Sequence, residues 1–210
     1  MRSMRLLAAT AALTVSSVAV AGPNWTYAEL GYVAADSVGD EDSGGFVLNG
    51  SFGFADVFHV GGGIGAFELE GGKSKGGIDA DAFNVYVGYN PAMTDNVDAI
   101  VRVGYAETEG KATGGRAKAK ALGLTFGTRA MISEQFELNA FATYAAGNSK
   151  PNAGTKEDFV DWTYTVGGIY NFTDMFAAGV SLTIDSNPIE VDGVEITSGN
   201  AGTLFARINF

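Results

Sequence analysis

Few side chains in this sequence are of the kinds that carry out covalent or metal chemistry. Cysteine is absent and His59 is the single histidine, which excludes a metal site built from His and Cys and any thiolate nucleophile. Ser51 lies close to His59 in the sequence, so a serine activated by this histidine is one catalytic candidate. The acidic segment 36–42 (DSVGDED) lacks the ligand spacing and the closing Glu of a calcium loop. We therefore expect no metal ion and no other cofactor.

Charged residues offer a second kind of candidate site, at positions that favour three ion pairs: Asp98 with Arg102, Arg129 with Glu137, and Glu29 with Arg207. Arg129 and Glu137 flank the short segment 132–135, so a hairpin there brings them together. Glu29 and Arg207 fall on the first and last predicted strands, which become neighbours if a sheet closes on itself. Buried charges need partners whatever the function of the protein. We interpret the pairs as a plug that fills an interior, and a gate as the alternative.

The elements that position these residues are strands, because apolar and polar residues alternate along most of the chain. Polar clusters rich in Gly, Asp, Asn and Lys interrupt the alternation. Ten strands are predicted, at residues 25–34, 46–54, 58–69, 82–90, 97–107, 119–131, 136–146, 159–172, 176–185 and 198–210.

The segments between these strands are alternately short and long. The short ones lie near residues 55–56, 91–96, 132–135 and 173–174, and the long ones cover 35–45, 70–81, 108–118, 147–158 and 186–197. Short periplasmic turns and longer extracellular loops are typical of bacterial outer-membrane barrels. The pattern predicts an all-β, transmembrane, antiparallel up-and-down barrel of about ten strands, with eight as the second choice.

The chemistry of the two strand faces separates a membrane barrel from a soluble one. One face is large and apolar, with residues such as Leu48, Phe83 and Val166. The other is small, glycine-rich and polar, with few charges. Small polar residues suit the interior of a barrel, so the apolar face is predicted to contact lipid. Aromatic residues at strand ends, such as Trp162 and Tyr170, would form girdles at the membrane interfaces.

Bulk composition agrees with export and excludes several classes of function. Arg2 and Arg5 precede an uncharged stretch that ends in Ala19-Val20-Ala21, which predicts a secretory signal peptide at residues 1–21 and a barrel domain at 22–210. The formal net charge of −11 is unsuited to nucleic acid, which requires Lys and Arg against phosphate. No stretch after residue 21 is long and apolar enough for a transmembrane helix.

Several segments resemble those of small Gram-negative outer-membrane barrels of the OmpX/OmpA type: YAELGYVA, FGFADVFHVGGG, VYVGYNPAM, IVRVGYAE and the final TLFARINF. The sequence of these segments most resembles that of the short outer-membrane barrels of xanthomonad-like bacteria once discussed as immune elicitors. The terminal strand resembles the signal that such proteins present to the barrel assembly machinery, with Leu204, Ile208 and Phe210 on its lipid-facing side. The resemblance implies the cell outer membrane as location, with outer-membrane lipid and lipopolysaccharide as partners.

The function that we expect is a non-enzymatic role in envelope integrity or in surface interaction through the extracellular loops, with a partner that the sequence does not identify. The alternative is a narrow passive pore for water or small solutes. A protease or lipid-modifying enzyme is the remote alternative. Ten-stranded outer-membrane proteases use a His and several Asp at the extracellular rim, whereas His59 is predicted near the periplasm, where geometry does not suit a general base.

Overall fold

The computed structural model describes residues 26–37, 41–55, 57–69, 78–112, 115–151, 156–185, 189–191, 194–196 and 200–210. The predicted signal peptide at residues 1–21 lies outside these ranges, as do residues 38–40 of the acidic segment. Within the described ranges, no helix is long and apolar enough to cross a membrane.

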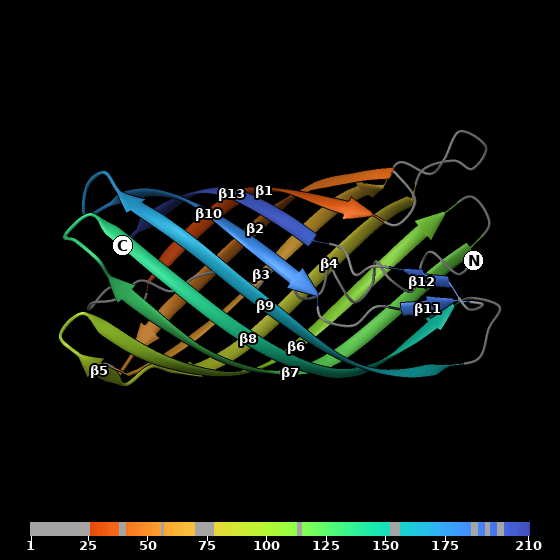
Figure 1. The fold of residues 1–210 in the computed structure, drawn as a ribbon, viewed down its shortest axis with the longest axis horizontal. Helices are drawn as coiled ribbons and strands as arrows, with labels where there is room; N and C mark the ends of the chain where they lie inside the picture. The colour runs from red at the N-terminus through yellow and green to blue at the C-terminus, as the bar shows by residue number, and fades with distance from the viewer. Residues whose placement is uncertain are drawn as a thin grey trace.

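The described part of the chain is built from ten long strands and three short ones (Figure 1). The long strands are β1 (Tyr27–Ser37), β2 (Glu41–Phe54), β3 (Phe58–Leu69), β4 (Ile78–Tyr89), β6 (Val97–Ala112), β7 (Gly115–Met131), β8 (Phe136–Pro151), β9 (Glu157–Asn171), β10 (Phe176–Asp185) and β13 (Asn200–Asn209). The short ones are β5 (Ala92–Thr94), β11 (Ile189–Val191) and β12 (Val194–Ile196).

The ten long strands form one closed antiparallel barrel. Their order is β4-β3-β2-β1-β13-β10-β9-β8-β7-β6, and pairing of β4 with β6 completes the ring. The first and last strands pair from Tyr27 opposite Asn209 to Ala35 opposite Ala201, with Glu29 opposite Arg207. Every long strand pairs with its neighbours in sequence, as in an up-and-down barrel, and closure leaves none of these strands as a free edge. The predicted fold class and the strand number of ten are therefore confirmed.

Strand ends differ from the prediction at the end of the barrel that carries the long connections. Residues 108–118 were expected to be loop, yet β6 and β7 stay paired there as far as Ala112 and Gly115. β8 and β9 likewise extend into the predicted loop 147–158, and β11 with β12 forms a hairpin inside the predicted loop 186–197. The prediction relied on apolar alternation, which ends where a strand leaves the lipid and both of its faces become polar.

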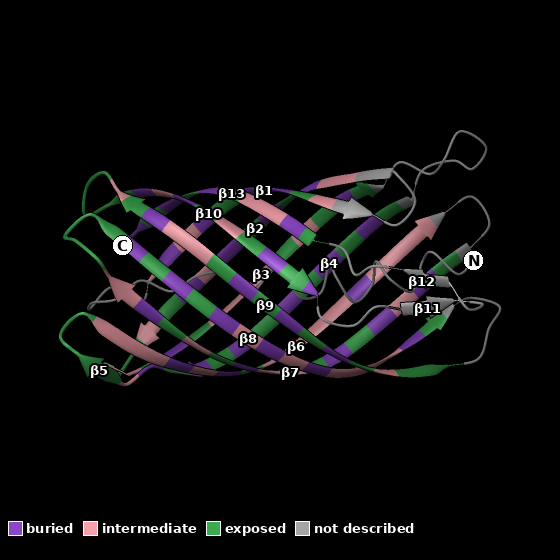
Figure 2. Cartoon of the chain, viewed as in Figure 1, coloured by how far each residue is buried: buried purple, intermediate pink, exposed green. Residues whose placement is uncertain are grey.

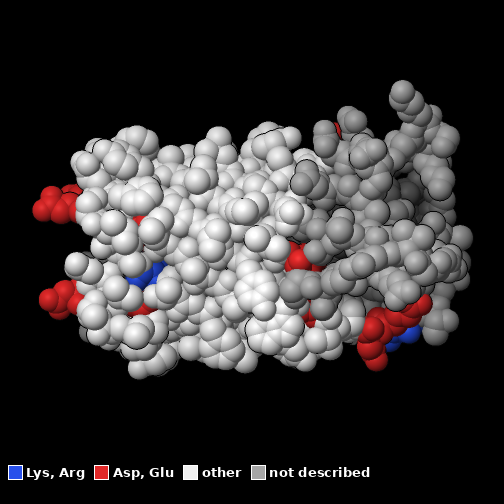
Figure 3. Space-filling view, viewed as in Figure 1, with Lys and Arg blue, Asp and Glu red and all other residues white. Residues whose placement is uncertain are grey.

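Burial alternates along the strands, which sets an inner and an outer surface (Figure 2). The outer surface is apolar: Phe46, Leu122 and Leu204 are 63%, 65% and 63% exposed. On the face of the barrel shown in Figure 3, most of the described surface is uncharged, with few Asp, Glu, Lys or Arg side chains on the wall. A broad apolar exterior of this kind requires lipid rather than water around it.

Candidate functional site

The interior of the barrel is the candidate site, since it holds the buried charged side chains. Arg129 of β7 and Glu137 of β8 flank the turn at residues 132–135 and are both fully buried. Arg129 donates from Nε to Oε1 of Glu137 and from Nη2 to Oε2, each at 2.5 Å. This bidentate contact matches the planar guanidinium to the carboxylate and fixes both side chains on the inner surface of β7 and β8.

A second ion pair joins the first and last strands. Arg207 of β13 donates from Nε to Oε1 of Glu29 on β1 at 2.7 Å, and its Nη2 contacts the same oxygen. The Arg207 guanidinium also lies 4.3 Å from the ring centroid of Tyr27. The pair ties together the two strands whose contact closes the barrel, at a place where water has almost no access.

Arg102, which was predicted to pair with Asp98, has a different neighbourhood. Its Nε donates to Nε2 of His59 at 3.1 Å, and its guanidinium lies over the rings of Tyr86 and Phe141. Asp98 instead lies directly opposite Arg129 in the β6–β7 register and is half-buried. Inward charges on one strand four residues apart are separated by more than a side chain's reach at about 3.3 Å per residue.

His59 has both ring nitrogens engaged. Nε2 accepts from Arg102, so Nδ1 carries the hydrogen and donates to Oδ1 of Asn90 at 2.9 Å. His59, Gly88 and Arg102 occupy one row across β3, β4 and β6. A Cβ at Gly88 would overlap the His59 ring, so this glycine is what lets the histidine reach across β4. The arrangement leaves neither nitrogen of His59 oriented towards Ser51, and it does not form a serine–histidine catalytic pair.

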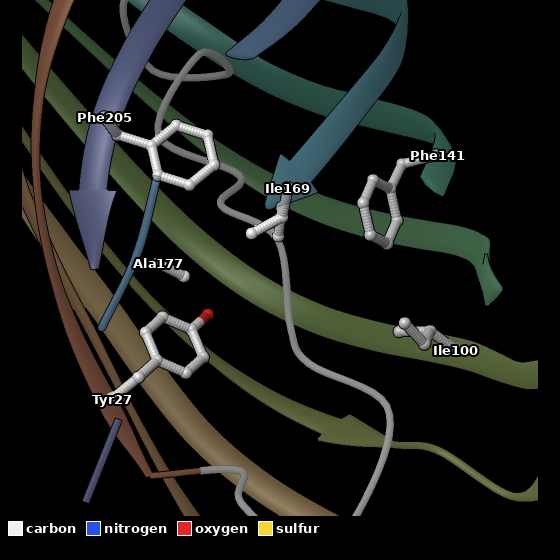
Figure 4. Close-up of a cluster of buried hydrophobic side chains, with 6 residues drawn as sticks. All are labelled: Tyr27, Ile100, Phe141, Ile169, Ala177 and Phe205. Atoms are coloured by element: carbon white, nitrogen blue, oxygen red, sulfur yellow. The ribbon is translucent and has the colours of Figure 1, made fainter. Parts of the chain in front are cut away.

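Apolar side chains complete the filling of the interior, which the sequence analysis did not foresee. Figure 4 shows them converging from opposite walls of the barrel, with the rings of Phe205 and Phe141 on different strands. The cluster, all of it less than a tenth exposed, consists of Tyr27, Ile100, Phe141, Ile169, Ala177 and Phe205. The signal was present in the sequence, because each of these residues occupies an inward position in the same alternation that identified the polar face.

Inward glycines make room for aromatic rings in the lumen. A Cβ added at Gly61, Gly127 or Gly179 would overlap the ring of Tyr86, Phe141 or Phe205, respectively. At Gly65 an added Cβ would lie 2.7 Å from Cε2 of Phe67. The glycine-rich inner face is thus largely covered by aromatic side chains.

Away from the ion pairs and the first apolar cluster, the two sides of the lumen differ in the side chains that line them. Hydroxyl pairs line β7 to β10, where Thr125 contacts Thr143 at 2.9 Å and Thr165 contacts Thr183 at 3.0 Å. The wall formed by β1 to β4 and β13 carries a second apolar cluster, consisting of Val33, Val47, Phe67, Ala80, Ala82 and Ala201. Paired hydroxyls of this kind satisfy one another, and the buried carboxyl groups of Asp161 and Asp185 lie further along β9 and β10.

The terminal residues assigned to assembly lie on the outer surface. Leu204, Ile208 and Phe210 are 63%, 41% and 70% exposed, and Phe210 donates its backbone N–H to the carbonyl of Thr26 at 2.9 Å. The last residue of the chain is therefore held against the start of β1 while its side chain faces outwards.

A closed antiparallel barrel with an apolar exterior, a polar and packed interior, and tight turns at one end defines the class of outer-membrane β-barrel proteins. This protein is a member of that class and lies in the outer membrane of a Gram-negative cell. Neither a family model nor a curated protein matches its sequence.

Solved outer-membrane barrels share the fold. An outer membrane channel from Pseudomonas putida F1 aligns with a TM-score of 0.55 at 9% identity, over 92% of this chain and 100% of the channel. The translocator domain of the autotransporter NalP from Neisseria meningitidis gives 0.56 at 10% identity, over 88% and 87% of the two chains. The NanC porin gives 0.52 at 11% identity, over 88% and 100%. Identities this low establish a common fold alone.

Proposed function

We propose that the protein is a non-enzymatic outer-membrane barrel that acts through its outer surface and extracellular end, in envelope integrity or surface interaction, and not as a conduit. The packed interior carries this proposal. Arg129, Glu137 and Arg207 are at most 1% exposed, as are Ile100 and Ile169. A barrel of this size is narrow enough for side chains to fill it.

The engagement of His59 supports the non-enzymatic part of the proposal. A general base requires a nitrogen within hydrogen-bond reach of its substrate, and both ring nitrogens of His59 contact other side chains. We also propose that a signal peptide at residues 1–21 directs export. The barrel assembly machinery would then recognise the terminal strand through Leu204, Ile208 and Phe210.

Electrical recording in planar bilayers tests the proposal. We expect the refolded protein to show no steady conductance, because Arg129–Glu137, Arg207–Glu29 and the aromatic cluster fill the lumen. A Tyr27→Ala/Phe205→Ala variant removes two rings from the plug and is expected to conduct, which checks that the protein has inserted. Steady channels in the unmodified protein would overturn the proposal.

A narrow passive pore for water or small solutes is the second candidate. The hydroxyl-lined stretch of wall formed by Thr125, Thr143, Thr165 and Thr183 favours it, since polar groups that line a pore suit small solutes. Two of the structurally similar proteins are described as a channel and a porin. Steady conductance that changes when Arg102 or Arg129 is replaced would favour this candidate.

A further inference from the structure

The extracellular end of β7 carries a column of basic residues on its outer face. Arg116, Lys118 and Lys120 occupy consecutive outward positions, with side chains that are 66%, 42% and 48% exposed. Lys150 on β8 is exposed on the same face. We call these four residues the basic patch. A run of basic residues on one side of a strand presents its charge to a single surface.

The register of the strands places like charges directly against each other. Lys118 lies opposite Lys150 in the β7–β8 pairing, and Arg116 lies opposite Lys111 in the β6–β7 pairing. Like charges at directly opposite positions of an antiparallel pair are destabilising. A bound anion between Lys118 and Lys150 would remove this repulsion.

Acidic side chains flank the basic patch on both of its outer sides: Glu109 of β6 pairs with Arg116 at 3.6 Å, and Asp158 of β9 lies opposite Asn148 of β8. Glu107 lies opposite Lys120 on the β6 side, and Lys118 donates to it, which lowers the pKa of the Glu107 carboxyl. Exposed ion pairs of this kind contribute little to stability, so they compete weakly with a doubly charged anion. On the β8 side, the residue opposite Lys120 is the uncharged Asn148. The space between β7 and β8 therefore faces bases without an acid between them.

The basic patch lies immediately beyond the apolar band. The next outward residue of β7 after Lys120 is Leu122, which is 65% exposed. On β8, Tyr144 lies four residues before Asn148 and packs against Trp162 of β9, with ring centroids 5.3 Å apart. Aromatic pairs of this type mark the membrane–water interface. The patch thus sits at the depth of the headgroups of the outer leaflet.

The opposite end of the barrel lacks exposed basic residues in its described part. Its described turns carry Asp95, Glu134 and Asp174 and no Lys or Arg. Exposed bases are therefore confined, among the described residues, to the end that faces the outer leaflet. This asymmetry matches a leaflet whose headgroups bear phosphate.

We infer that the basic patch binds a phosphate group of the phosphorylated glycolipid of the outer leaflet, held between Lys118 and Lys150 with Arg116 and Lys120 beside it. The inference rests on the proposed function, in which the outer surface is the working part of the molecule. A phosphate oxygen accepts hydrogen bonds from both ammonium groups, and the acyl chains of the same lipid lie along Leu122 and its neighbours.

Binding of purified lipid A to the refolded protein in a neutral detergent tests the inference. Each basic side chain near such a phosphate surface contributes about 1 kcal/mol, so Lys118→Gln and Lys150→Gln are each expected to raise the Kd about fivefold. The double variant is expected to raise it by about 25-fold, since the two free-energy losses add, and Lys118→Arg is expected to retain binding. Dephosphorylated lipid A should bind the unmodified protein as weakly as the double variant binds lipid A.

Asn96→Asp serves as the matched control, because it makes the same change in net charge at the opposite end of the barrel. Over that distance screening leaves little effect, so its Kd should equal that of the unmodified protein. An equal loss in Asn96→Asp, or equal binding of dephosphorylated lipid A, would overturn the inference, as would equal binding of anionic phospholipid micelles. Conductance is measured separately, so failure of the docking site and failure of the proposed function give different results.

Discussion

At the scale of single residues, the interior shows how three arginines are kept inside a narrow barrel. Arg129 and Arg207 each face a carboxylate, whereas Arg102 faces the imidazole of His59 and two aromatic rings. Removing both partners of a buried pair in favour of apolar groups is often tolerated, but removing one leaves an uncompensated charge. The main effect of these ion pairs on stability is therefore that the protein is destabilised when only one partner is removed.

Glu137→Ala tests this asymmetry. It leaves the Arg129 guanidinium buried without its carboxylate, and we expect the free energy of unfolding to fall by about 3–5 kcal/mol. Urea unfolding in lipid vesicles measures the change. The double variant Arg129→Met/Glu137→Leu should lose much less, and Glu134→Gln, in the exposed turn nearby, should change little. A double variant as unstable as Glu137→Ala would contradict the interpretation.

Gly88→Ala tests the contact that the sequence did not reveal. The added Cβ would overlap the ring of His59, and forcing extra volume into a packed interior costs about 1–3 kcal/mol. We expect that loss of stability together with a changed NMR environment of the His59 ring, because the imidazole must leave Arg102. Gly123→Ala is the control, since its Cβ would meet nothing nearer than Cγ2 of Thr143 at 3.7 Å. Equal effects of the two variants would rule out steric overlap as the cause.

At the scale of strands and turns, side-chain contacts between adjacent strands could be predicted from the sequence. The approach of Arg129 to Glu137 follows from a short turn between them, and that of Glu29 to Arg207 follows from closure of the first strand on the last. The contact of His59 with Arg102 reaches across an intervening strand at Gly88. It depends on the stagger of three strands, which alternation along a single strand does not specify.

The same limit explains the strand ends. Outward Glu107 and Lys120 belong to the paired extracellular ends of β6 and β7, but these segments have the polar composition of a loop. Inside the membrane the apolar face identifies a strand, whereas beyond the membrane only backbone pairing does. The prediction of β-structure was therefore accurate across the lipid-facing band and too short at the extracellular end.

The turn between β2 and β3 offers a test at this scale. Ala55 has a φ of 50°, a left-handed conformation that costs an L-residue about 1–2 kcal/mol and glycine much less. Ala55→Gly is expected to raise the free energy of unfolding by about 0.5–1 kcal/mol, measured by urea titration. Ala140→Gly, on the outer face of β8, should instead lower it by about 0.5–1 kcal/mol. Destabilisation by both variants would show that the turn is not strained.

At the scale of the whole molecule, the barrel is an apolar band between two charged ends. The basic patch, with Lys118 and Lys120, marks one boundary and the acidic turns, with Glu134 and Asp174, mark the other. The buried interior has no contact with lipid, so the position of the protein in the membrane is set by its outer surface. That position predicts how much stability the protein loses when a charged side chain replaces each outward residue.

Two outward residues of β9 test the position of the band. Val166 lies between the outward aromatic residues Trp162 and Tyr170, while Val160 lies beyond Trp162 towards the charged end; they are 52% and 54% exposed. An arginine at the centre of the bilayer costs about 2–4 kcal/mol, and one near the interface costs about 0–1 kcal/mol. Val166→Arg should therefore destabilise the protein in vesicles far more than Val160→Arg. In detergent micelles, which adapt to the protein, the difference should shrink. Equal costs at the two positions in vesicles would place the band elsewhere on the barrel, and with it the depth assigned to the basic patch.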